Sequence, residues 1–301
     1  MKINIRINLL IVLLSMIMTP SFLKAQANVD SILKSSKTFF TSSNKYGRND
    51  SVGKYYDIRG IKIYVEVYGQ GEPLLLIHGN GGSIRRSSPL IYEFQNKYKV
   101  IAVDCRNYGK SIDQGDSLSD EMIADDISEL LIKMNINSVY VLGMSSGANS
   151  ALWLAAKYPN QVIKAVINGA NLTSNAETIG EYWNMHHKNI LDSINSIQNK
   201  TEKDKIELKI IKREYNNMTL EDLHKIQAPS LIISGDYDTI KPSHSLQIFE
   251  NIKKSYLYIQ PSSGHLISWI YKDEFVKKID HFFSTPYKQF TEKDKSDFNQ
   301  K

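Results

Sequence analysis

The fold is decided by the stretch Val139-Tyr140-Val141-Leu142-Gly143-Met144-Ser145-Ser146-Gly147-Ala148, which joins a short apolar run to an amphipathic segment. The run has the length and β-branched content of a buried strand, and residues 146–158 have the pattern of a helix that ends before Pro159. A serine between two glycines at a strand-to-helix turn is typical of a nucleophile elbow, in which small flanking residues allow the turn to lift the hydroxyl above the sheet. Because the same pattern also occurs as a plain glycine-rich turn, the surrounding sequence has to decide.

Short apolar runs alternate with helix-length amphipathic segments on both sides of this motif. The runs lie at residues 74–77, 100–103, 139–142, 162–167, 231–233 and 256–259. They are typical of strands buried on both faces of a parallel sheet. Residues 61–68 instead alternate apolar and polar side chains, which predicts a strand with one wetter face. The repeated order of strand and helix predicts an α/β fold with a doubly wound, mostly parallel sheet.

The segment 172–225 breaks this rhythm, because it contains helix-like polar sequence and no buried-strand run. It is predicted to be a small helical lid inserted into the core. The core then consists of residues 54–171 and 226–285, before and after the lid. Residues 28–53, rich in serine, asparagine and lysine, are predicted to be an N-terminal arm, and residues 286–301 a charged tail.

The N-terminus has the organisation of a secretory leader. Lys2 and Arg6 precede an apolar run at residues 9–18, and the small-residue pattern Ala25-Gln26-Ala27 follows. This order predicts a signal peptide over residues 1–27, cleaved after Ala27. The alternative is a signal anchor, but an apolar run of about ten residues is much shorter than the roughly twenty that span a bilayer. We therefore expect export to a periplasm or out of the cell, with no membrane anchor left after cleavage.

Composition excludes several classes of function. Removal of the leader lowers the formal net charge from +5 to about +2, and no long run of one sign remains, so no nucleic-acid partner is expected. The only cysteine, Cys105, follows an apolar run and is predicted to be a buried thiol. The sequence contains no metal-ligand spacing, Walker loop or dinucleotide fingerprint, so no cofactor or metal is expected. The oligomeric state is not predicted.

Four segments in order along the chain carry a family resemblance. They are Leu74-Leu75-Leu76-Ile77-His78-Gly79-Asn80-Gly81-Gly82, then Asp104-Cys105-Arg106-Asn107-Tyr108-Gly109-Lys110-Ser111, then the elbow, and last Gly235-Asp236-Tyr237-Asp238 with Ser262-Ser263-Gly264-His265 after it. Together they resemble the α/β-hydrolase superfamily, in its single-lid serine esterase and C–C hydrolase-like branch. The resemblance implies an eight-stranded sheet with a lid. It also implies a site where the strands end at their carboxyl edge.

The resemblance assigns roles to three side chains. Ser145 corresponds to the nucleophile, His265 to the base that takes its proton, and Asp238 to the acid that orients the imidazole. Asp236 is a neighbouring alternative, but the family's G-x-x-D pattern falls on Asp238. Ser146 is the alternative nucleophile, but only the middle position of the elbow projects from the turn.

Backbone groups complete the expected site. The amides of Asn80 and Ser146 are expected to form the oxyanion hole. Structural support is expected from the residues beside them, namely His78, Gly79, Gly143 and Gly147.

The serine at the elbow separates this chain from the dehalogenase and epoxide hydrolase relatives, which carry an aspartate there. We therefore expect an exported serine hydrolase that cleaves a small carboxylic ester, thioester or lactone through an acyl-enzyme, with a small ester-like molecule as its substrate. An aminopeptidase, an acyltransferase and a C–C hydrolase remain alternatives on the same fold. A non-catalytic member that only binds a ligand is the alternative from another class.

Overall fold

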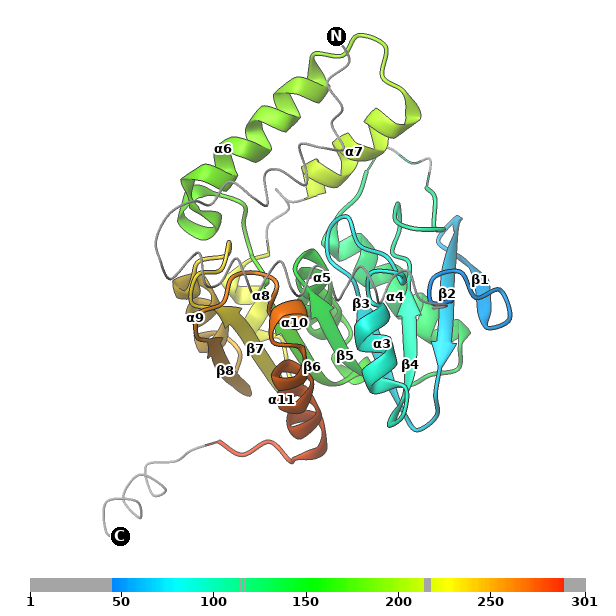
Figure 1. Cartoon of the computed structure of the whole chain (residues 1–301), viewed down its shortest axis with the longest axis vertical. Coiled ribbons are helices and arrows are strands. Elements are labelled where there is room, and N and C mark those ends of the chain that lie inside the picture. Colours follow the sequence, from blue (N-terminus) through cyan, green and yellow to red (C-terminus); the bar gives the residue numbers. More distant parts are fainter. Residues whose placement is uncertain (1–44, 114, 116, 214–217, 290–301) are drawn as a thin grey trace. The chain divides into compact units, whose positions relative to one another are not determined.

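The computed structural model describes residues 45–113, 115, 117–213 and 218–289 (Figure 1). The predicted leader at residues 1–27, most of the predicted arm and residues 290–301 of the predicted tail lie outside the described residues.

One eight-stranded sheet organises the described part of the chain. Its strands are β1 (Gly53–Ile58), β2 (Ile61–Tyr68), β3 (Glu72–Ile77), β4 (Tyr98–Val103), β5 (Val139–Met144), β6 (Val162–Asn168), β7 (Ser230–Gly235) and β8 (Ser255–Gln260). They are ordered β1-β2-β4-β3-β5-β6-β7-β8. The pairs β1–β2 and β2–β4 are antiparallel and all other pairs are parallel. The predicted doubly wound, mostly parallel sheet is confirmed.

Helices cover both faces of this sheet (Figure 1). They are α3 (Ser88–Phe94), α4 (Asp120–Lys133), α5 (Ser146–Lys157), α6 (Ala176–Asn195), α7 (Glu202–Arg213), α8 (Leu220–His224), α9 (Pro242–Glu250), α10 (Ile267–Ile270) and α11 (Lys272–Ser284), with a 3₁₀ turn at Pro159–Gln161. Side chains of α4, α5, α8 and α9 share one apolar core, and those of α3, α10 and α11 share the other. Successive strand residues such as Leu74 and Leu75 point into opposite cores, which explains why these runs are apolar throughout.

Two details at the edge of the sheet differ from the sequence expectation. Strand β1 was missed, because only Ile58 among its residues is buried and the apolar pattern is therefore weak. It forms a hairpin with β2 across Arg59 and Gly60, whose φ angles of 45° and 83° are typical of a two-residue turn. The predicted wetter face of residues 61–68 is wrong. Glu66 is fully buried there, and its carboxylate accepts hydrogen bonds from Tyr64, Tyr68 and two backbone amides of the segment 47–49.

Most described residues of the segment predicted as a lid lie in the helices α6, α7 and α8. Helix α6 contacts α7, and Gly180, with φ 76° and ψ 158°, interrupts α6 near its start. Before the interruption, Thr178 and Ile179 are buried, and Thr178 accepts a hydrogen bond from the Lys241 amide. Helix α8 packs on the core, because Leu223 is fully buried in the cluster that contains α5.

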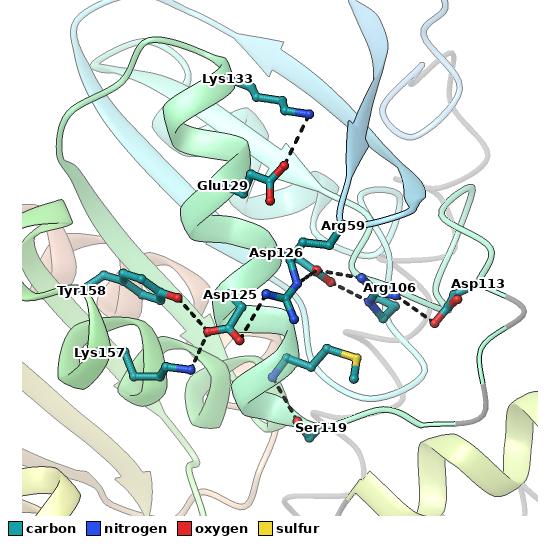
Figure 2. A network of polar contacts seen from close by, with 11 residues as sticks. Arg59, Arg106, Asp113, Ser119, Asp125, Asp126, Glu129, Lys133, Lys157 and Tyr158 are labelled. Atoms are coloured by element: carbon teal, nitrogen blue, oxygen red, sulfur yellow. Dashed lines mark hydrogen bonds and ion pairs between the residues drawn. The ribbon is translucent and has the colours of Figure 1, made fainter.

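A buried ion network holds the loop that follows β4. The Arg106 guanidinium donates to Asp126 of α4 at 2.7 and 2.8 Å and to Asp113 at 3.0 Å (Figure 2). Burial raises the pKa of Asp126, against the effect of Arg106. Burial also acts to raise the pKa of Asp113, but hydrogen bonds from Gly115 and Arg106 and nearby positive charge lower it overall. From the lid side, the buried Lys209 of α7 donates to the carbonyls of Asp113 and Gly115. The same loop therefore contacts both the core and the lid.

Candidate active site

Ser145 lies in a strained turn between β5 and α5. Its φ of 55° and ψ of −126° fall in a region that residues with a side chain rarely adopt, and its amide donates to the Asn168 carbonyl at 2.8 Å. A Cβ on Gly143 would lie 2.6 Å from the Ala148 Cα, and one on Gly147 would lie 2.4 Å from the His78 carbonyl oxygen. Both glycines of the motif are therefore required by close backbone approach.

Three side chains form one chain of hydrogen bonds above the sheet. His265 Nε2 lies 2.8 Å from Ser145 Oγ, and His265 Nδ1 lies 2.6 Å from Asp238 Oδ1. Burial acts to raise the pKa of Asp238, but the positive charge and hydrogen bond of His265, with the amides of Ile240 and Gly235, outweigh it and lower that pKa. Because an ionised Asp238 accepts from Nδ1–H, Nε2 is left to accept the proton of the Ser145 hydroxyl. This arrangement can activate a serine for attack on a carbonyl carbon.

The second acid of the Gly235–Asp238 segment has a different role. Asp236 accepts hydrogen bonds from the Ser262 and Ser263 amides, both at 2.9 Å. Of the two carboxylates, Asp238 is the one bonded to His265, while Asp236 holds the loop that carries the histidine. In the sequence analysis Asp236 was only the alternative acid, and no other role was predicted for it.

Gly169 was missed by the sequence reasoning although it contacts the imidazole. It has φ 66°, and a Cβ there would lie 2.7 Å from His265 Cε1. A side chain at this position would displace the ring. The available indication was a glycine directly after a buried strand, at the edge where the site was expected.

The loop after β3 lies against the nucleophile. A Cβ on Gly79 would lie 2.8 Å from the Met144 carbonyl oxygen and 2.9 Å from Ser145 Cβ. His78 is buried, donates from Nδ1 to the Gly79 carbonyl at 2.8 Å, and accepts from the Cys105 amide at Nε2 at 3.1 Å. Both its ring nitrogens are thus bonded to backbone groups, which gives His78 a structural place beside the site.

The two expected oxyanion donors flank Ser145. Asn80 follows Gly79 in the adjacent loop, and Ser146 is the first residue of α5. The amide of Ser146 therefore lies at the positive end of the helix dipole, where negative charge is stabilised. Cys105 is buried, as predicted. In the described residues, no group of three or more histidine, cysteine or acidic side chains is arranged to hold a metal, and no helix is long and apolar enough to cross a membrane.

Two models of known protein families match the chain. The family model for the alpha/beta hydrolase fold matches residues 72–186. The model for the C-terminal domain of BAAT and acyl-CoA thioester hydrolases matches residues 130–287, which is more than half of the chain. The chain belongs to the alpha/beta hydrolase superfamily.

Similar proteins of this superfamily are themselves hydrolases. The mouse (Mus musculus) protein serine hydrolase BPHL is 26% identical, over 75% of this chain and 84% of its own length. An Escherichia coli 2-hydroxy-6-oxononadienedioate/2-hydroxy-6-oxononatrienedioate hydrolase is 23% identical, over 75% of this chain and 92% of its own. The solved structure of an esterase from Exiguobacterium antarcticum matches this alpha/beta hydrolase with a TM-score of 0.68 and 20% identity, over 77% of this chain and 100% of the other.

Proposed function

We propose that this alpha/beta hydrolase is a serine hydrolase that cleaves a small carboxylic ester, thioester or lactone through an acyl-enzyme. The observation that carries the proposal is the continuous chain from Ser145 Oγ through the His265 ring to Asp238, with contacts of 2.8 and 2.6 Å. Contacts of this length allow proton transfer in both directions along the Ser145–His265 bond. The matching family models and the hydrolase relatives support the same class of reaction.

The proposed reaction has two halves. In the first, Ser145 Oγ attacks the substrate carbonyl carbon while His265 Nε2 takes the hydroxyl proton, and the oxyanion that forms is bound by the amides of Asn80 and Ser146. His265 then gives the proton to the leaving alcohol or thiol, and the acyl group stays on Ser145. In the second half, a water loses a proton to His265 and attacks the acyl carbon. The carboxylic acid leaves and Ser145 regains its proton. Asp238 stabilises the imidazolium in both halves.

A C–C hydrolase is the second candidate, because the name of the E. coli relative describes a hydrolase of a 2-hydroxy-6-oxo dienedioate. The two candidates share the Ser145–His265–Asp238 chain and differ in the bond that breaks. Parallel assays on p-nitrophenyl acetate and on a 2-hydroxy-6-oxo dienoate separate them, since only the ester assay releases an alcohol.

We also propose that the protein acts outside the cytoplasm, on a small-molecule substrate. The support is the sequence of residues 1–27, with its basic start, apolar run and Ala25-Gln26-Ala27 pattern. N-terminal sequencing of the protein from fractionated cells tests this. A periplasmic or external protein that begins at residue 28 is the expected result, and an uncleaved cytoplasmic protein contradicts it.

Active-site labelling tests the catalytic proposal. A fluorophosphonate probe should label the wild type on the peptide that contains Ser145, and neither Ser145→Ala nor His265→Ala should react. Ser284→Ala is the matched control, because its hydroxyl lies on the exposed end of α11, and it should label like the wild type. A folded wild type that neither reacts nor turns over any ester would contradict the proposal and favour a ligand-binding protein.

A further inference from the structure

Tyr108 lies beside the loop of residues 78–84, the oxyanion loop, which carries Asn80. It is not one of the three side chains, Ser145, His265 and Asp238, to which we assign the reaction. Its side chain is only 4% exposed, and its hydroxyl donates to Asn80 Oδ1 at 2.9 Å. Its ring meets the His78 ring edge-on, with centroids 5.0 Å apart and an angle of 71° between the planes. Tyr108 therefore contacts both His78, the first residue after β3, and Asn80, whose amide we place in the oxyanion hole.

The turn that carries Tyr108 is fixed at several points. The Tyr108 amide donates to the Cys105 carbonyl at 2.9 Å, and the Ser111 amide donates to the Tyr108 carbonyl at 2.9 Å. The residues on either side, Asn107 and Gly109, have φ angles of 67° and 54°. A tyrosine at the tip of so tight a turn has little freedom to follow a movement of its partner.

Two further hydrogen bonds join this turn to the oxyanion loop. Asp104 Oδ1 accepts from the Ile84 amide at 2.8 Å, and His78 accepts from the Cys105 amide at 3.1 Å. These bonds hold the two ends of the segment 78–84. The hydroxyl of Tyr108 is bonded to its middle, at the side chain of Asn80.

Asn80 lies in a β-turn within the oxyanion loop. Gly82 N donates to the Gly79 carbonyl at 3.0 Å, so Asn80 and Gly81 occupy the centre of a β-turn, with Gly81 at φ 63°. No heavy atom outside the adjoining residues lies within 4 Å of a Cβ built on Gly81, so packing gives little restraint there. The hydrogen bond that closes this turn does not use the Asn80 amide. The Tyr108 hydroxyl therefore restrains this turn through the Asn80 side chain.

We propose that Tyr108 is a positioning residue of the oxyanion hole, which holds Asn80 so that its backbone N–H points to the reacting carbonyl at Ser145. This rests on the proposed function. Tyr108 acts through Asn80 and does not touch the substrate. Loss of a whole oxyanion donor typically lowers kcat by about 10²–10³-fold. We expect misalignment of one donor to lower kcat less than its loss, by about tenfold.

The substitution Tyr108→Phe removes the hydroxyl and keeps the ring against His78. With p-nitrophenyl acetate, kcat should fall about tenfold while KM stays within twofold. The affinity of an alkylboronic acid, which forms a tetrahedral adduct on the serine, should fall by the same factor. Tyr158→Phe is the matched control. It removes a hydroxyl that donates to Asp125 at 2.8 Å (Figure 2). Because Tyr158 follows the last residue of α5 and Ser145 precedes the first, this change should leave kcat unchanged.

A double-mutant cycle with Asn80→Ala tests the route of the effect. Asn80 is exposed, so its truncation should leave the protein folded. In that background Tyr108→Phe should have no further effect on kcat. A wild-type kcat in Tyr108→Phe, or an undiminished loss in the Asn80→Ala background, overturns the positioning role. If Tyr108→Phe does not fold, a kcat for Asn80→Ala equal to that of the wild type overturns it as well. Failure of the proposed function is a different result, in which the wild type itself neither labels nor turns over esters.

Discussion

Protonation of His244 should weaken the fold and loosen the base of the lid. His244 lies on α9, is 8% exposed, and accepts the Leu172 amide at Nε2 at 2.9 Å, which requires a neutral ring. Burial lowers its pKa from 6.5 to about 4, against a smaller raising effect of a hydrogen bond with Gln247. Leu172 is also bonded to the far end of the lid, because its carbonyl accepts from the Met218 amide at 3.1 Å. Protonation therefore removes a contact where both ends of the lid meet.

The magnitude and sign follow from that pKa. Between pH 6.5 and about 4 the unfolded chain binds a proton at His244 that the folded protein does not bind. The free energy of unfolding therefore falls as the pH is lowered through this interval. At about 1.4 kcal/mol for each pKa unit, the contribution of this histidine is about 3 kcal/mol. Asp238, whose pKa is lowered from 3.8, loses its contribution only below that interval.

Urea unfolding at pH 7, 5.5 and 4.5 measures this contribution. His244→Gln keeps an acceptor near the position of Nε2 and cannot titrate, so its free energy of unfolding should fall by about 3 kcal/mol less than that of the wild type over the interval. His224→Gln, which removes an exposed imidazole on α8, is the control and should follow the wild type. Parallel pH profiles for the wild type and His244→Gln would refute the reasoning.

Three further predictions concern the site and the lid. Asp238→Asn should lower kcat by about 10⁴-fold with the fold retained, measured by ester turnover and circular dichroism. Lys209→Met removes the two hydrogen bonds to the 113–115 carbonyls, so proteolysis within α7 should become faster while the melting temperature of the core is unchanged. Gly169→Ala should lower kcat at least tenfold because its Cβ would lie 2.7 Å from the His265 ring, whereas Gly60→Ala, also at positive φ but with nothing near its Cβ, should not. Equal kcat values for these two alanine variants would contradict the steric argument.

The edge strand β8 is only partly buried and was found from its aromatic and aliphatic residues, but the other apolar runs that the sequence predicted correctly are strands β3 to β7, which are largely buried on both faces. In such strands each residue is apolar whichever way it points, so a short run is enough to find them. Strand β1 escaped because it is an edge strand with five of its six residues not buried. The burial of Glu66 was also missed. The groups that donate hydrogen bonds to its carboxylate come from Tyr64, Tyr68 and the segment 47–49. No local pattern shows that those groups meet around one carboxylate.

The same distinction holds within the site. The residues around Ser145 follow from the motif, because Gly143 is required by close approach within the turn itself, although the close contact at Gly147 comes from the end of β3. Gly169 and Tyr108 act on residues 96 and 28 positions away, on His265 and on Asn80. Their roles depend on which strands are neighbours, and the order of the sheet is what brings them together.

That order explains the division of work between the two acids of the Gly235–Asp238 segment. Five parallel strands are neighbours in the order β3, β5, β6, β7 and β8, and their carboxyl ends lie at one edge of the sheet. His265 follows β8, so it has to reach back over β7 and β6 to Ser145, across three strand spacings or about 14 Å. The reach requires a residue without a side chain after β6, which is Gly169. It also requires a fixed starting point for the histidine loop, and Asp236 supplies this by binding the Ser262 and Ser263 amides. Asp238 is then left to orient the ring.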